Sequence, residues 1–137
     1  MQRPIDRHTA LIFTMVLVSA AEGEMTDAEL ETIGRQVRHL PVFKEFDEDR
    51  LTEVGRQCAE LLHEEDGLAL AVDMIAEALP RPLRETAYAL ACEVDAADGA
   101  LAIEELNLLG MRRQELSIDR LVAVAIERAT YARHAVL

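Results

Sequence analysis

Residues 18–30 read Val-Ser-Ala-Ala-Glu-Gly-Glu-Met-Thr-Asp-Ala-Glu-Leu. A second copy, residues 94–106, reads Val-Asp-Ala-Ala-Asp-Gly-Ala-Leu-Ala-Ile-Glu-Glu-Leu, with six identities in thirteen positions at a fixed offset of 76. Each copy has the order of a helix end, an acidic residue, a glycine, and a new helix whose first turn carries a glutamate. The sequence therefore predicts two related helical hairpins, at about residues 7–40 and 83–116.

Apolar residues around the repeat are also spaced for helices, and nowhere follow the sustained period of two that strands show. Short connections favour antiparallel neighbours in one compact bundle. We therefore expect an all-α fold in which residues 1–137 form a single domain. The pattern predicts seven helices, at about residues 7–21, 27–40, 47–66, 68–79, 83–97, 103–116 and 118–134.

Three further expectations concern individual helices. Thr26 and Glu29 form the Thr-x-x-Glu pattern of a capping box, so the helix at 27–40 should begin after Thr26. Ser117 is the expected cap of the last helix. The helix at 68–79 is nearly all apolar, and we expect it to be the most buried.

The N-terminal segment has a superficial likeness to a secretory signal peptide, with Arg3 and Arg7 before an apolar run at residues 10–18. Asp6 interrupts the basic start, and part of the segment recurs in the middle of the chain. We therefore interpret it as a helix of the mature fold. The run is shorter than the roughly 20 residues that span a bilayer, so we expect a cytoplasmic protein without direct membrane insertion.

Composition restricts the partners of the chain. It has 14 Lys and Arg against 26 Asp and Glu, a formal net charge of -12, and 4% aromatic residues. Such a chain repels phosphate backbones and anionic lipids and lacks aromatic rings for stacking, so no nucleic-acid binding is expected. Cationic partners, either metal ions or basic protein surfaces, are favoured instead. Cys58 and Cys92 have no metal-ligand spacing and are predicted to be inert core thiols in a reducing compartment.

Both repeats match the second half of an EF-hand loop, with a carboxylate at position 5, glycine at 6, an apolar residue at 8 and glutamate at 12. The first half is missing, because valine and alanine stand at positions 1 and 3. A standard EF-hand is therefore excluded, and any cation would have fewer protein ligands and more waters. The candidate ligands are Glu22, Glu29, Asp98 and Glu105, with Ser19, Asp95 and Glu93 as further oxygen donors.

The same residues also have a purely structural interpretation. Gly23 and Gly99 fit helix C-caps, and Glu29 is explained by the capping box and by the helix dipole. Acids near helix C-termini oppose the dipole and are explained less well; these are Glu22, Asp95 and Asp98. A bound cation or a neighbouring arginine would compensate them. The sequence leaves open whether these acids form a cation site or a solvated acidic face.

At this motif the chain resembles the TerB family of tellurite-resistance proteins, through residues 20–29 and 96–105. The resemblance implies an all-helical fold of tandem hairpins, an acidic face that binds divalent cations such as calcium, and a role in resistance to tellurite and other stresses. It also implies association with other proteins of that system, including an integral membrane partner. The acidic positions of the family correspond to Glu22, Glu29, Asp98 and Glu105. The chain departs from the family at Glu22, where aspartate is usual, and at Ala102.

No glycine-rich phosphate loop or nucleophile motif occurs in the chain, so neither an enzyme nor an organic cofactor is expected. An acidic protein is also a poor direct binder of the tellurite oxyanion. We expect a non-enzymatic module that binds divalent cations. The alternative is a metal-independent adaptor that docks a basic protein surface through its acidic face, and a third hypothesis is a metal-dependent hydrolase.

Overall fold

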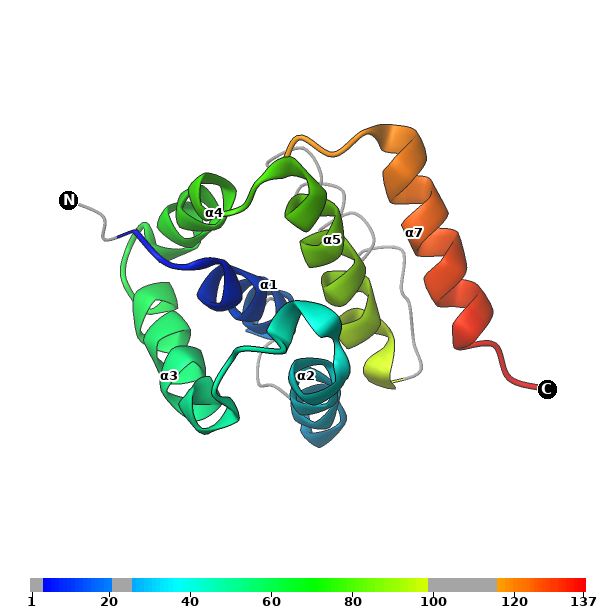
Figure 1. The fold of residues 1–137 in the computed structure, drawn as a ribbon, viewed down its shortest axis with the longest axis horizontal. Helices are drawn as coiled ribbons and strands as arrows, with labels where there is room; N and C mark the ends of the chain where they lie inside the picture. The colour runs from blue at the N-terminus through cyan, green and yellow to red at the C-terminus, as the bar shows by residue number, and fades with distance from the viewer. Residues whose placement is uncertain (1–3, 21–25, 99–115) are drawn as a thin grey trace.

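The computed structural model describes residues 4–20, 26–98 and 116–137 (Figure 1). Within these ranges the chain forms α-helices and 3-10 turns and no strand, which confirms the all-α class. The helix predicted at 103–116 lies, apart from Leu116, outside the described residues. The elements are α1 (Arg7–Ala20), α2 (Asp27–His39), η1 (Pro41–Phe43), η2 (Glu48–Arg50), α3 (Leu51–Leu62), α4 (Gly67–Ala78), α5 (Arg81–Asp95), η3 (Ala96–Asp98) and α7 (Arg120–Arg133).

Helix α1 is the centre of the bundle. It packs against α3, α4, α5 and α2, and every residue from Thr9 to Ser19 is buried. Figure 1 shows α3 and α4 on one side of α1, with α5 and α7 on the other. A helix that is enclosed in this way must be apolar on nearly all sides, which explains the run from Ala10 to Val18. In the described part of the chain, no helix has both the length and the apolar character needed to cross a membrane.

The expectation that the helix at 68–79 is the most buried is wrong. In α4 only Gly67, Ala71, Val72 and Ile75 are buried, and Leu68 is 48% exposed. The reason is position rather than composition. Helix α4 packs against α1 and α3, which leaves its outer face in solvent.

The cap of α7 also differs from the prediction. Asp119, not Ser117, is the N-cap, because its Oδ1 accepts a hydrogen bond of 2.8 Å from the Leu121 N–H. Ser117 lies two residues earlier with a φ of 56°, in the left-handed region. The chain therefore completes a turn at Ser117 before the helix begins at Arg120.

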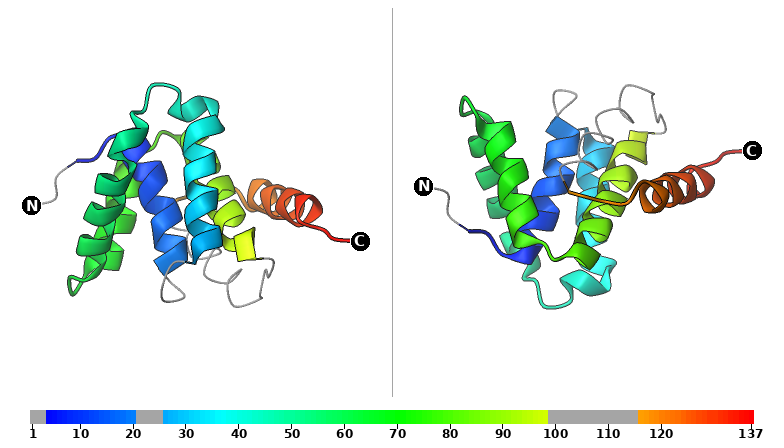
Figure 2. Two further views of the ribbon diagram at one scale, coloured as in Figure 1. Left: turned by 90° about the horizontal axis from the view of Figure 1, so that it is seen from below. Right: turned by 90° about the horizontal axis from the view of Figure 1, so that it is seen from above.

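Helices α1 and α5 correspond to each other at the sequence offset of 76, and they pack together. Helix α2 returns alongside α1 and contacts both α5 and η3. The two views of Figure 2 show that α1 ends, α2 begins and α5 ends at the same end of the bundle. This end therefore holds the residues on both sides of the first repeat loop and those that precede the second.

Candidate functional site

Glu29 is the one predicted ligand whose side chain the structure describes. Its Oε1 accepts a hydrogen bond of 2.9 Å from the Thr26 N–H, and the Glu29 N–H donates to Thr26 Oγ1 over 3.1 Å. This confirms the predicted capping box. Glu29 is only 3% exposed, although Thr26 and Asp27 beside it are exposed. The carboxylate therefore stabilises the start of α2 and lies in the interior at the loop end of the bundle.

The other predicted ligands stay predictions. Glu22 and Glu105 lie outside the described residues. The backbone of Asp98 closes η3, but its side chain is outside the described part of the structure. Among the side chains that are described, no group of three or more His, Cys, Asp or Glu could hold a metal ion.

Ser19 and Asp95 occupy equivalent positions in the two repeats, and both are buried, at 0% and 4% exposure. The Ser19 hydroxyl donates to the Met15 carbonyl over 3.2 Å, so it is engaged with its own helix. Asp95 is the last residue of α5, where the helix dipole is negative. A buried carboxylate at that place needs donors or a cation around it. Both repeats thus place a polar side chain inside the same end of the bundle.

Glu93, a further candidate oxygen donor, contacts the C-terminal end of α7. It forms an ion pair with Arg133 and a contact of 3.1 Å between its Oε2 and His134 Nε2. In the same interface the hydroxyl of the fully buried Tyr88 donates to Glu127 Oε2. This group of polar contacts between α5 and the C-terminal part of the chain was not predicted from the sequence. Its members lie on two helices that are far apart in the chain, so no local spacing indicates it.

Both cysteines are buried, as predicted, at 0% exposure for Cys58 and 1% for Cys92. Burial raises the pKa of each thiol to about 12, and the charges of Glu127 and Asp95 add to this for Cys92. At pH 8 we therefore expect a disulfide exchange reagent to label neither thiol in the native protein, and both in guanidinium chloride. Rapid labelling of the native protein would contradict the buried placement.

The capping box offers a test of what Thr26 does. Thr26→Ala removes the acceptor for the Glu29 N–H, so we expect the free energy of unfolding to fall by about 1 kcal/mol. Thr26→Ser keeps the hydroxyl and should cost much less. Urea denaturation measures both. Equal stability of the alanine variant and the unmodified protein would show that the box does not stabilise α2.

Comparisons of the chain with protein-family models, with curated proteins and with solved structures found no match. The resemblance to the TerB family therefore rests on the repeated motif alone.

Proposed function

We propose that this chain is a non-enzymatic, TerB-like stress-response protein of the cytoplasm that binds divalent cations and acts with other proteins of a tellurite-resistance system. The proposed ligands are Glu22, Glu29, Asp98 and Glu105, with Ser19 and Asp95 nearby in the sequence. One observation carries the proposal. The elements on both sides of the first repeat loop, and the one that precedes the second, lie at one end of the bundle, and this end holds the buried carboxylates Glu29 and Asp95.

Calcium is the first ion to test. It is a hard cation that accepts six to eight oxygens in flexible geometry, and waters can complete the shell where protein ligands are few. Half an EF-hand loop supplies fewer carboxylates than a complete one. We therefore expect weak binding, with a Kd of about 10⁻⁴ M, at the low-affinity end of known calcium loops.

A metal-independent adaptor is the second candidate. Its support is the formal net charge of -12. An adaptor of this kind would dock a basic protein surface, and its complex should survive a chelator but weaken with salt.

The deciding experiment is a calorimetric calcium titration of chelator-stripped protein, with magnesium as competitor. We expect saturable binding that is lost in the Asp98→Asn/Glu105→Gln double variant. The matched control is Asp73→Asn/Glu77→Gln, which removes the same charge from exposed positions on α4 and should bind as the unmodified protein does. No heat up to millimolar calcium, checked at a second temperature, would contradict the cation proposal and favour the adaptor.

Glu29→Gln separates capping from ligation. If Glu29 is a ligand, the variant loses calcium affinity while Thr26→Ala keeps it. If both variants lose stability and keep the calcium affinity, Glu29 acts only in the capping box with Thr26, and it must be removed from the proposed ligand set.

A further inference from the structure

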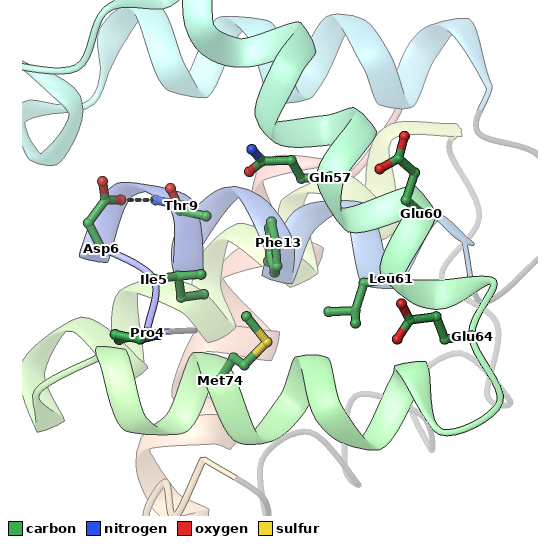
Figure 3. A pocket seen from close by; sticks show the side chains of 10 residues that line it. All are labelled: Pro4, Ile5, Asp6, Thr9, Phe13, Gln57, Glu60, Leu61, Glu64 and Met74. Atoms are coloured by element: carbon green, nitrogen blue, oxygen red, sulfur yellow. Dashed lines mark hydrogen bonds between the residues drawn. The ribbon is translucent and has the colours of Figure 1, made fainter. Parts of the chain in front are cut away.

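A groove of about 640 Å³ lies between the start of α1, α3 and α4, on the side of the bundle away from α7. Figure 3 shows the side chains that line the groove. The Asp6 carboxylate is at one end and Glu60 and Glu64 are at the other, while apolar side chains lie between them. The central apolar side chains are Ile5, Phe13, Leu61 and Met74.

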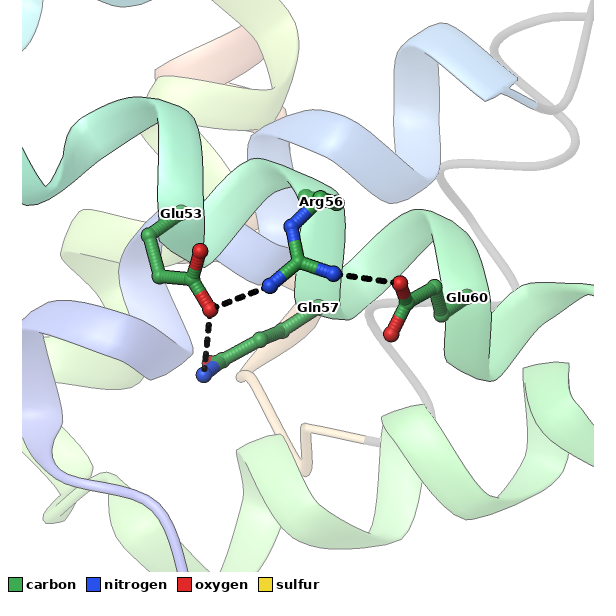
Figure 4. Close-up of polar contacts among 4 residues, drawn as sticks. All are labelled: Glu53, Arg56, Gln57 and Glu60. Atoms are coloured by element: carbon green, nitrogen blue, oxygen red, sulfur yellow. Dashed lines mark hydrogen bonds and ion pairs between the residues drawn. The ribbon is translucent and has the colours of Figure 1, made fainter.

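The charged side chains that line the groove are all acidic. Three carboxylates line it, and none of the described residues in its lining is basic. Arg56 is the nearest cation on α3, and it is shared between Glu53 Oε1 at 2.6 Å and Glu60 Oε1 at 2.5 Å (Figure 4). One guanidinium between two carboxylates leaves a net negative charge at that end.

The Asp6 carboxylate at the other end is also negatively charged. Burial raises the pKa of Asp6, but the hydrogen bonds from Thr9 and the nearby charges of Arg50 and His8 lower it by more. One of these bonds joins the Thr9 N–H to Asp6 Oδ1 over 2.7 Å, so Asp6 also caps α1. The net pKa is below its ordinary value, and the carboxylate is ionised at neutral pH. Its role as a cap holds it in place at the mouth of the groove.

The separation of the charges selects the kind of occupant. A metal ion needs several oxygens at one point, whereas here the carboxylates stand at opposite ends of the groove. An anionic lipid or a nucleic acid would be repelled. An occupant must instead be cationic at its ends and apolar between them, which is the pattern of an amphipathic segment with lysine or arginine beside its apolar side chains.

We propose that this groove docks a basic amphipathic segment of a partner protein. Apolar side chains of that segment cover the half-buried Leu61 and Met74, and its basic side chains meet Asp6 at one end and Glu60 and Glu64 at the other. The proposal goes beyond cation binding. It uses none of the proposed calcium ligands, so either proposal can fail without the other.

The test uses a short helical peptide of lysine and leucine as the probe, with its leucines at helical spacing, and the full chain as the receptor. We expect saturable binding by calorimetry, with amide chemical-shift changes concentrated on α3, α4 and the start of α1. A glutamate–leucine peptide of the same pattern should not bind. Raising the salt concentration should weaken the complex.

Variants locate the site. Asp6→Asn/Glu64→Gln keeps a capping side chain at position 6 and should raise the Kd roughly tenfold. Met74→Lys places a cation in the groove and should abolish binding. Glu31→Gln/Glu85→Gln removes the same charge from exposed positions on α2 and α5, and its Kd should stay within about twofold of the unmodified protein. Calcium binding should be unchanged in all of these variants.

Two outcomes would overturn the proposal. Equal weakening by the groove pair and by the Glu31/Glu85 pair would show that the peptide responds to net charge alone. Spermidine displacing the peptide at equal concentration, with the same dependence on Asp6 and Glu64, would assign the groove to a small organic cation instead of a protein segment.

Discussion

Replacing Gly67 with alanine is expected to lower the free energy of unfolding by about 3 kcal/mol. Gly67 is the first residue of α4, directly after the tight turn from α3. A Cβ at this position would overlap the carbonyl oxygen of Leu61 and lie 2.8 Å from its carbonyl carbon. Both atoms belong to the backbone, so no side-chain rotation relieves the overlap. Helix α4 would have to move away from α3, and its packing on α1 would loosen.

Gly55 provides the matched control for this substitution. It lies inside α3, and no atom comes within 4 Å of the place where its Cβ would be. Alanine removes the entropic cost of glycine in a helix, so Gly55→Ala should raise the free energy of unfolding by about 0.5 to 1 kcal/mol. Urea denaturation of both variants measures the difference. A change of the same sign for both would contradict the close approach of α4 to α3.

The second large effect is expected at Leu11. This residue is 0% exposed, in the middle of the enclosed helix α1. Leu11→Ala removes buried methyl groups and leaves a cavity that the surrounding helices cannot all close at once, so we expect a loss of about 3 to 4 kcal/mol. Thermal and urea denaturation both measure it.

Leu68→Ala is the matched control, since it makes the same change on α4. Leu68 is 48% exposed, and its replacement should cost about 0.5 kcal/mol or less. The pair distinguishes the observed arrangement from the one that composition predicted. Equal losses at Leu11 and Leu68 would mean that α1 is no more enclosed than α4.

Local signals were enough to predict the helical class and several of its boundaries. Helices α1 and α2 begin and end within about a residue of the predicted positions, because the capping box at Thr26 and the proline after Leu40 act through neighbouring residues. The buried thiols were also predictable, since Cys58 follows the apolar spacing of its helix. In these cases the physical cause lies within one or two turns of the residue concerned.

Burial was not predictable from composition. Helix α4 is more uniformly apolar than α1, but its outer face lies at the surface. Helix α1, in contrast, is covered on several sides. The cap of α7 was misplaced for a related reason. Ser117 has the right chemistry, but the path of the chain places a left-handed turn there and leaves the capping position to Asp119.

The acidic residues also divide into those whose contacts follow from local sequence and those whose contacts depend on tertiary packing. Residue spacing alone was enough to select Glu29 as the partner of the N-cap Thr26, because both hydrogen bonds of the capping box join these two residues. No spacing connects Asp6 with Glu60 and Glu64, which come together around one groove only because α3 and α4 pack on the start of α1. Hydrogen bonds within a turn are encoded locally, whereas a groove exists only between elements, so its charge and shape were decided by the tertiary structure.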